Sequence, residues 1–350
     1  MHLILILILT LNFSCAEKKS SENDTGTSES ARPSKSDTLK FVSGIRAILQ
    51  DSKGNYWFGS HQEGVGFYDG KSFEYFTTNE GLWDNQIRSI LEDASGTIWF
   101  GTANGVSSYD GENLTKHTPI ENGEWQSEWI KTENDLWFNA GTNPGVYRYD
   151  GQNLHYLAFP ELQVVNPDNR YLVTGLAEGE DDMLWIGTYA GVIGYNGDQF
   201  TILNDATLKL KEEADLLHVR SIFEDSKGRL WIGNNGIGVL LRDRGATTNF
   251  SEKNNLIHPT SSRRGDKSPA GTLEHVFAIG EDGEGNIWFG DRDAGVWKYD
   301  GESMTNYIVD STLSTQMVWS ISRNKVGDLL FGMAAGGVYT FNGESFERMF

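Results

Sequence analysis

The stretch Thr97–Glu112, TIWFGTANGVSSYDGE, contains an aromatic triplet, a Gly-Val pair and a Tyr-Asp-Gly turn signal. Asp-Gly between runs of β-branched and aromatic residues is a preferred hairpin turn, because both central residues of that turn adopt positive φ. The stretch therefore predicts short antiparallel strands. Its aromatic side chains could line a binding site or fill a core, and recurrence of the pattern elsewhere in the chain distinguishes these two interpretations.

The pattern occurs seven times along the chain. Successive triplets lie 38 to 57 residues apart, and a Gly-Val pair follows each of them. The triplets begin at Trp57, Trp99, Trp137, Trp185, Trp231, Trp288 and Leu330. A turn signal of the form Asp-x-x-Gly precedes most copies, as at Asp93–Gly96. Seven copies at such a period indicate a repeat architecture.

Each repeat is predicted to form four short antiparallel strands. In the second copy these strands are Ile87–Glu92, Ile98–Thr102, Val106–Tyr109 and Asn113–His117. Sustained helical periodicity is missing after the N-terminal residues; Ala206–Leu217 comes nearest, and we expect a loop or one short helix there. Four strands in a repeat of about 40–50 residues are typical of a β-propeller blade. We therefore expect an all-β fold, a seven-bladed β-propeller of four-stranded antiparallel blades, over residues 39–350.

The repeat resembles a known family. The segment Ile87–Thr118, IRSILEDASGTIWFGTANGVSSYDGENLTKHT, is similar to the two-component regulator propeller repeat of bacterial sensors and free-standing envelope proteins. The resemblance extends over residues 39–350 and implies a sensing or binding function at the cell envelope. The sensors of the family carry two such propellers, a β-sandwich, a membrane span and a histidine kinase. Only one propeller is found here, so we expect a free-standing module without a direct signalling output.

The N-terminal residues predict an export signal and a lipid anchor. Residues 3–11 form an apolar run that is too short to span a bilayer but long enough for a signal peptide. The run leads to Ser14-Cys15, and Cys15 is the single cysteine, so it cannot form an internal disulfide. A small residue before such a cysteine resembles a bacterial lipoprotein cleavage site. The alternative is an incidental cysteine within an ordinary signal or anchor.

These features divide the chain into three parts. We expect residues 1–15 to be a signal peptide that ends at a lipid-modified Cys15, which would hold the protein at the periplasmic or cell-surface face of a membrane. Residues 16–38 contain no Val, Ile, Leu or aromatic residue and are predicted to be a disordered linker. The formal net charge of −20 and pI near 4.7 exclude general binding to nucleic acid or to anionic membranes. A monomer is expected that contacts the membrane through its anchor alone.

The innermost strands contain one variable position, which we place at the mouth of the central channel. Alignment of these strands on Val/Ile-x-x-Ile puts Arg46, Arg88, Glu128, Thr174, Arg220, Phe277 and Trp319 at that position. Three arginines there predict an anion site, because guanidinium groups bind carboxylate or sulfate bidentately. The alternative is that each arginine pairs with a carboxylate of a neighbouring blade, such as Glu128.

Loops at the same face supply further aromatic and polar side chains, a combination that suits a saccharide or peptide ligand. The ligand-binding residues that we predict are Arg46, Arg88, Trp125, Glu128, Trp129, Tyr189, Arg220, Asp291, Arg292 and Trp319. The tryptophans that begin the triplets are instead predicted to be core, because they recur at one structural position.

The sequence offers no recognisable catalytic or metal-binding motif. Its histidines lack zinc-like spacing, and neither a Gly-x-Ser-x-Gly elbow nor a phosphate-binding loop occurs. We therefore expect no cofactor, no metal and no enzymatic activity. The leading hypothesis is an envelope module that binds a saccharide or peptide at the channel mouth, alone or for a two-component sensor or transport protein. The alternatives are a protein–protein interaction scaffold and a propeller lyase or hydrolase.

Overall fold

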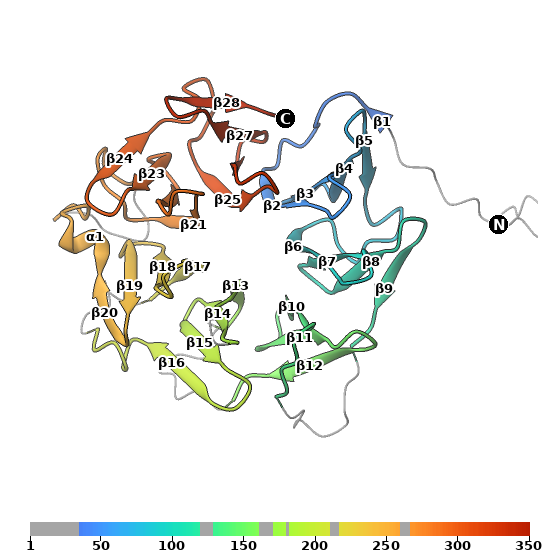
Figure 1. Ribbon diagram of the computed structural model, residues 1–350, viewed down its shortest axis with the longest axis horizontal. Helices are drawn as coiled ribbons and strands as arrows, with labels where there is room; N and C mark the ends of the chain where they lie inside the picture. The colour runs from blue at the N-terminus through green and yellow to red at the C-terminus, as the bar shows by residue number, and fades with distance from the viewer. Residues whose placement is uncertain (1–34, 120–128, 161–170, 180–181, 211–216, 260–266) are drawn as a thin grey trace, which may run out of the picture. The chain divides into compact units, whose positions relative to one another are not determined.

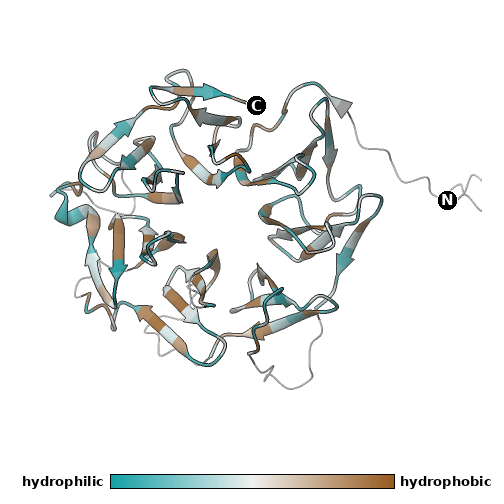
Figure 2. Cartoon of the chain, in the orientation of Figure 1, coloured by the Kyte–Doolittle hydropathy of each residue, from teal (hydrophilic) through white to brown (hydrophobic). Residues whose placement is uncertain are grey.

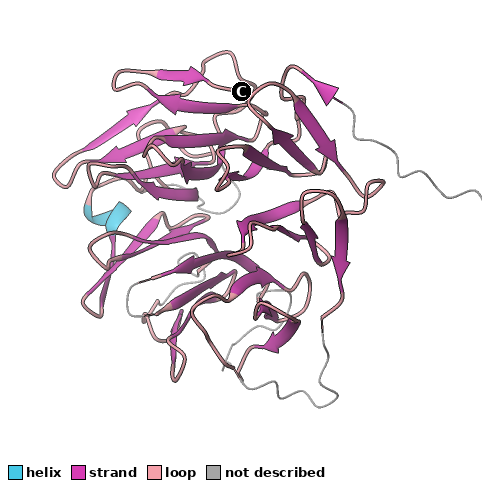
Figure 3. Cartoon of the chain, turned by 45° about the vertical axis from the view of Figure 1, so that its right-hand side comes forward, coloured by secondary structure: helices cyan, strands magenta, loops and turns pink. Residues whose placement is uncertain are grey.

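The computed structural model describes residues 35–119, 129–160, 171–179, 182–210, 217–259 and 267–350. Within Arg32–Phe350, antiparallel sheets follow one another around a common centre, each ordered outward from an inner strand (Figure 1). Strands dominate, and the single helix in the described part of the chain is α1 (Phe250–Lys253) (Figure 3). The prediction of an all-β, seven-bladed β-propeller is confirmed.

The blades are continuous segments of chain. The first three contain β1 (Lys35–Ser36), β2 (Ile45–Gln50), β3 (Tyr56–Ser60), β4 (Val65–Tyr68) and β5 (Phe73–Phe76); β6 (Ile87–Glu92), β7 (Ile98–Thr102), β8 (Val106–Tyr109) and β9 (Leu114–His117); and β10 (Leu136–Asn139), β11 (Gly145–Tyr149) and β12 (Leu154–Ala158). The strands of the second blade match those predicted from the sequence, except that the last begins at Leu114.

The remaining four blades each have four strands. They contain β13 (Val173–Glu178), β14 (Leu184–Thr188), β15 (Gly191–Tyr195) and β16 (Phe200–Asn204); β17 (Val219–Glu224), β18 (Leu230–Asn234), β19 (Val239–Asp243) and β20 (Ala246–Asn249); β21 (Val276–Glu281), β22 (Ile287–Asp291), β23 (Val296–Tyr299) and β24 (Met304–Tyr307); and β25 (Val318–Arg323), β26 (Leu329–Met333), β27 (Val338–Phe341) and β28 (Phe346–Arg348).

Two blades depart from four strands. The first blade has a fifth strand, because Lys35 and Ser36 of β1 pair with Glu74 and Phe73 of β5. These residues fall within the predicted linker, so the blade begins before residue 39. The third blade has three strands among the residues that the structure describes, with β10 innermost. Its departure from the pattern bears directly on the site described below.

The aromatic triplets form the core between blades. The six triplet tryptophans are 0% to 6% exposed, which confirms that they are framework. In the regular copies, the turn explains why aspartate stands six residues before the tryptophan: Asp225 accepts hydrogen bonds from the backbone N–H groups of Lys227 and Arg229 and, at 2.8 Å, from Nε1 of Trp231. The same aspartate–indole bond occurs at Trp57, Trp99 and Trp288. Figure 2 shows the resulting distribution, with hydrophobic residues on strands in every blade and hydrophilic ones in many connecting loops.

The ring closes by contact between the first and last blades, without exchange of a strand. Ser320 Oγ donates to the carbonyl of Ile45 at 2.9 Å, and the N–H of Lys325 donates to Gln50 Oε1 at 2.8 Å. The ring of Phe350 packs against Phe58 with 4.8 Å between centroids. Burial of aromatic surface at this seam therefore holds the two chain-distant blades together.

Candidate functional site

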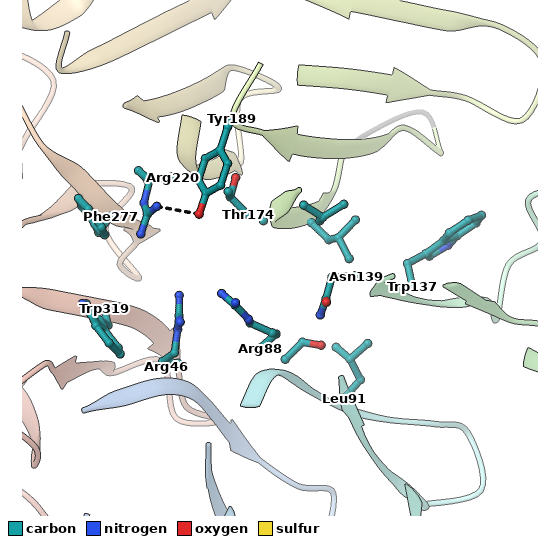
Figure 4. A pocket seen from close by; sticks show the side chains of 14 residues that line it. Arg46, Arg88, Leu91, Trp137, Asn139, Thr174, Tyr189, Arg220, Phe277 and Trp319 are labelled. Atoms are coloured by element: carbon teal, nitrogen blue, oxygen red, sulfur yellow. Dashed lines mark hydrogen bonds between the residues drawn. The ribbon is translucent and has the colours of Figure 1, made fainter. Parts of the chain in front are cut away.

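A cavity of about 250 Å³ lies at the inner ends of the blades (Figure 4). Its wall includes Arg46, Arg88, Thr174, Arg220, Phe277 and Trp319, all from the variable position of the innermost strands. In each of the six blades with a described inner strand, the register shifts at this residue, as between Ile87 and Ser89. Such a bulge re-aims one side chain out of the strand pattern. The repeat thus directs its most variable residue into the cavity.

The guanidinium groups of two of these arginines lie over aromatic rings. Arg220 lies 4.3 Å from the ring centroid of Phe277, and its Nη1 donates to the Tyr189 hydroxyl at 3.1 Å. Arg46 lies 4.6 Å from the ring centroid of Trp319. Stacking on a ring face holds a guanidinium in place while its N–H edges remain available. These arginines are therefore held in position by neutral partners.

The environment of Arg46 is strongly electropositive. Burial, followed by repulsion from Arg88 and Arg220, holds the pKa of Arg46 well below its usual range. Nδ1 of His61 accepts hydrogen bonds from Arg46 Nη1 and Gln86 Nε2, each at 3.0 Å. Burial and the two nearby arginines lower the pKa of His61 to about 4, so this imidazole is neutral at pH 7. His61 therefore adds no positive charge to the three arginines at neutral pH.

No carboxylate in the described parts of the chain forms an ion pair with Arg46, Arg88 or Arg220. Arg88 donates instead to the amide oxygen of Gln86 at 2.7 Å. The described residues of the cavity wall likewise include no Asp, Glu or His. The predicted pairing with Glu128 lies outside the described residues. Asp84 lies close enough to Arg88 to interact with its charge without forming an ion pair. Among the described residues, the geometry therefore presents three arginines to one cavity whose wall has no carboxylate.

The structure brings five of the predicted binding residues to this cavity: Arg46, Arg88, Tyr189, Arg220 and Trp319. Trp125 and Glu128 lie outside the described residues, as does Cys15.

Trp129 is not part of the cavity wall and packs between the third and fourth blades, beside Trp137. Its Nε1 donates to the carbonyl of Ala158 at 2.8 Å, and its ring stacks beside Phe159 and packs against Tyr195. Trp129 therefore fills a core position rather than the channel mouth.

Asp291 and Arg292 also lie away from the cavity wall. Asp291 is fully buried and accepts hydrogen bonds from the backbone N–H groups of Asp293, Ala294 and His275. Burial raises the pKa of Asp291 to about 7 despite these bonds. Arg292 pairs with Asp293 at 2.8 Å. Both residues shape the loop between β22 and β23.

Several residues of the cavity wall were not predicted. They are Ser89, Leu91, Trp137, Asn139, Val173, Gly175 and Leu176, which lie on the side of the second, third and fourth blades. One signal pointed to them: the residue six positions before Trp137 is Lys131, where the regular copies have aspartate. The loss of this turn residue marks the third repeat as irregular.

No cluster of three or more His, Cys, Asp or Glu side chains suited to a metal ion occurs among the residues that the structure describes. In the same residues, no helix could cross a lipid bilayer.

Solved structures of known proteins share this fold. The extracellular domain of the hybrid two component system BT3049 from B. thetaiotaomicron has a TM-score of 0.65 at 20% identity, covering 90% of this chain and 42% of that one. Virginiamycin B lyase from Staphylococcus aureus has a TM-score of 0.63 at 16% identity, with 88% and 97% covered. The chain thus spans about two fifths of the sensor domain. Identities this low show the fold alone, and no curated protein matches the sequence.

The family described as Two component regulator propeller matches residues 41–62, 81–104 and 215–236. Each matched segment contains the first and second strands of a blade: β2 and β3, β6 and β7, or β17 and β18. The resemblance inferred from the sequence is confirmed. The chain is therefore a seven-bladed propeller that carries two component regulator propeller repeats.

Proposed function

We propose that the chain is a ligand-binding module of a bacterial cell-envelope sensing system, which captures an acidic saccharide or peptide at the cavity. One observation carries this proposal: the guanidinium groups of Arg46, Arg88 and Arg220 share the cavity and form no ion pair with a described carboxylate. An anionic ligand would relieve their mutual repulsion. Each charge-assisted hydrogen bond that it accepted would contribute about 1.5–3 kcal/mol.

The location and partner in this proposal come from the family. The sensor structures that share the fold are described as extracellular domains, which supports a place outside the cytoplasmic membrane. We propose that Cys15 carries the lipid anchor and that residues 16–34 act as the tether. An envelope sensor or a transport protein would then receive the captured ligand or read its presence.

The other two hypotheses receive less support. A lyase requires a group that can accept a proton from the substrate. The described cavity wall has no Asp, Glu or His, and the hydroxyl of its Tyr189 already accepts a hydrogen bond from Arg220. Binding without turnover therefore suits the cavity better. A scaffold requires a contiguous exposed apolar surface. The large exposed apolar side chains of the described residues are instead spread over several blades, at Val42, Trp83, Ile130, Ile308, Val326 and Met349.

Calorimetric titration with trigalacturonate, and with a neutral trisaccharide of equal length, tests the proposal. We expect the acidic ligand to bind and to bind more weakly at high salt, because screening weakens the charge interactions. Replacing Arg46, Arg88 and Arg220 with alanine should weaken binding at least about 100-fold, since several charge-assisted bonds are lost together.

A matched variant controls for net charge. Arg242, Arg244 and Arg323 lie outside the cavity wall, and their replacement with alanine removes the same three charges. This variant should bind normally. If both variants bind alike, or if the neutral trisaccharide binds as tightly as the acidic one, the arginine cluster is not the binding site.

A further inference from the structure

A second cavity, of about 260 Å³, continues from the arginine-lined cavity along the innermost strands. The two cavities share wall residues, among them Arg46, Arg220, Phe277 and Trp319. Two residues further along the inner strands, the wall of the second cavity is aliphatic and contains Ile48, Ile90, Ile222, Ile279 and Ile321. The repeat thus places an isoleucine-lined cavity directly behind the arginines.

The isoleucines offer surface to this cavity although they also pack in the core. Ile45 and Ile87, which begin two of the inner strands, are 0% exposed. Ile48 and Ile90 in the same strands keep 8% and 6% exposure, and both belong to the wall of the isoleucine-lined cavity. Apart from the arginines at its mouth, the described wall residues of this cavity carry no charge. The cavity therefore presents aliphatic surface that a ligand can cover.

The charge along the inner strands changes sign from one end to the other. At the far end from the arginines, β6, β13, β17 and β21 each end in a glutamate. Two of these, Glu92 and Glu281, accept hydrogen bonds from turn serines of the preceding blade. Glutamates repel an anion, whereas the arginines attract one. A carboxylate is therefore favoured at the arginine end of the channel and disfavoured at the other.

The spacing of the two layers sets the size of a group that joins them. Two residues along a strand span about 6–7 Å. Figure 4 shows the guanidinium groups of Arg46, Arg88 and Arg220 directed toward one another, so one carboxylate can accept from more than one of them. An aliphatic group on the carbon beside that carboxylate then reaches the isoleucines, past the rings of Phe277 and Trp319 that line both cavities.

We propose that the ligand is the C-terminus of a peptide that ends in leucine, isoleucine or valine. The inference rests on the proposed function and specifies its ligand. The terminal carboxylate accepts hydrogen bonds from the three guanidinium groups, and the last side chain enters the isoleucine-lined cavity. In a peptide C-terminus, the side chain and the carboxylate are attached to the same carbon, which matches the spacing of the two layers. A saccharide carries no aliphatic side chain to bury there.

The probe is acetyl-Gly-Gly-Leu with a free carboxylate, titrated calorimetrically into the full chain. Acetyl-Gly-Gly-Gly keeps the charge and lacks the side chain, whereas the amide of the leucine peptide keeps the side chain and lacks the charge. We expect both to bind at least about tenfold more weakly than the probe, because each loses one of the two contacts. Equal affinity of the leucine and glycine peptides would overturn the inference.

Two further ligands separate this inference from the proposed function. Binding of trigalacturonate without binding of the leucine peptide would overturn the inference and leave the proposed function standing, whereas failure of both ligands would overturn both. Octanoate offers a carboxylate and an aliphatic chain without a peptide. It should bind more weakly than the leucine peptide, because its longer chain would extend past the isoleucines to the glutamates. Tighter binding of octanoate would overturn the peptide as the ligand.

Isoleucine variants test the second cavity directly. Ile48→Thr combined with Ile321→Thr removes aliphatic surface from its wall and should reduce the preference for the leucine peptide over the glycine peptide several-fold. This preference is a ratio measured on one folded variant, so lower stability does not imitate the effect. Ile98→Thr combined with Ile287→Thr makes the same changes at buried residues outside both cavity walls and should keep the preference. An unchanged preference in the first variant would contradict the inference.

The heat capacity change on binding gives an independent measurement on the wild-type chain. Burial of apolar surface makes this change negative. The leucine peptide should therefore give a more negative value than the glycine peptide. Equal values would show that the leucine side chain stays in solvent, and the inference would be wrong.

Discussion

Replacing Asp225 with alanine should destabilise the propeller without altering the cavity. Asp225 is 3% exposed, and its Oδ1 accepts from the N–H groups of Lys227 and Arg229 at 3.0 and 2.9 Å. Its Oδ2 accepts from Trp231 Nε1 at 2.8 Å, and Trp231 is fully buried. Oδ2 also accepts from Nε of Arg229 at 2.6 Å, within an ion pair. The variant therefore leaves a buried indole N–H without an acceptor, breaks this ion pair and removes two bonds that fix the turn.

The magnitude follows from these bonds. An unsatisfied buried donor costs about 1–3 kcal/mol. The two turn amides regain water when the carboxylate is removed, so together they add about 1–2 kcal/mol. Loss of the partly exposed ion pair with Arg229 adds about 1 kcal/mol, so we expect a loss of about 3–6 kcal/mol in the free energy of unfolding. For Arg32–Phe350, an unfolding entropy of about 2.1 cal/mol/K per residue converts this loss into a midpoint about 4–9 °C lower.

Differential scanning calorimetry of wild type, Asp225→Ala and Asn324→Ala tests the reasoning. Asn324 fixes the same turn in the last blade, accepting from the N–H groups of Val326 and Asp328, but Leu330 stands there in place of a tryptophan. Asn324→Ala should therefore lower the midpoint by only about 1–3 °C. Equal shifts in the two variants would show that the indole bond and the Arg229 ion pair contribute nothing.

The remaining predictions concern acid stability, ring closure and location. Hydrogen bonds from the turn and from the indole outweigh burial and hold the pKa of Asp93, Asp225 and Asp282 below its ordinary value. Their contribution to stability is therefore complete above the unfolded pKa of about 3.9 and is lost as pH falls through the folded values. The thermal midpoint should drop below about pH 4, and Asp225→Asn should flatten that drop; an unchanged pH profile would contradict the assignment. Phe350→Ala should cost about 2–3 kcal/mol in urea unfolding, because its ring packs against Phe58, Phe73 and Tyr56 across the closing seam; a cost near zero would place closure elsewhere. Cys15→Ala should move the protein from the membrane fraction to the soluble fraction with an unchanged midpoint, and unaltered partitioning would refute the anchor.

Repetition made the framework of the propeller predictable from the sequence. As a rule, a residue type that recurs at the same position in every repeat has a structural role in the blade. The triplet tryptophans follow this rule, because all of them are buried. The rule also applies to Asp291, which the sequence analysis predicted as a ligand contact and which lies outside the cavity wall. It lies three residues after Trp288, where Ser60, Thr102 and Thr188 occupy the matching places. In that place Asp291 accepts bonds from its own loop, as Ser60 does from Glu63.

The arginine cluster could be placed because the bulge recurs. A one-residue register shift directs the same position of each inner strand inward, so variation at that position marks the cavity wall. The place of Trp129 could not be obtained in this way. Alignment with the regular copies assumes their turn length, whereas the third blade fixes its turn by bonds from Thr132 to Asp135. Tertiary packing against Tyr195 and Phe200 then decides where the ring of Trp129 lies.

The third blade can be irregular because its neighbours and one buried ion pair stabilise it. Arg148 Nε donates to Asp135 at 2.6 Å, and both side chains are nearly inaccessible to solvent. From the second blade, Trp99 packs against Tyr149 with 4.0 Å between ring centroids. These contacts fix the third blade between its neighbours although its turn departs from the repeat. Burying a charged pair is costly and contributes little net stability. The Arg148–Asp135 pair nevertheless holds the turn at Thr132 in one position. The blade that departs from the repeat in its turn therefore still contributes Trp137 and Asn139 to the wall of the arginine-lined cavity.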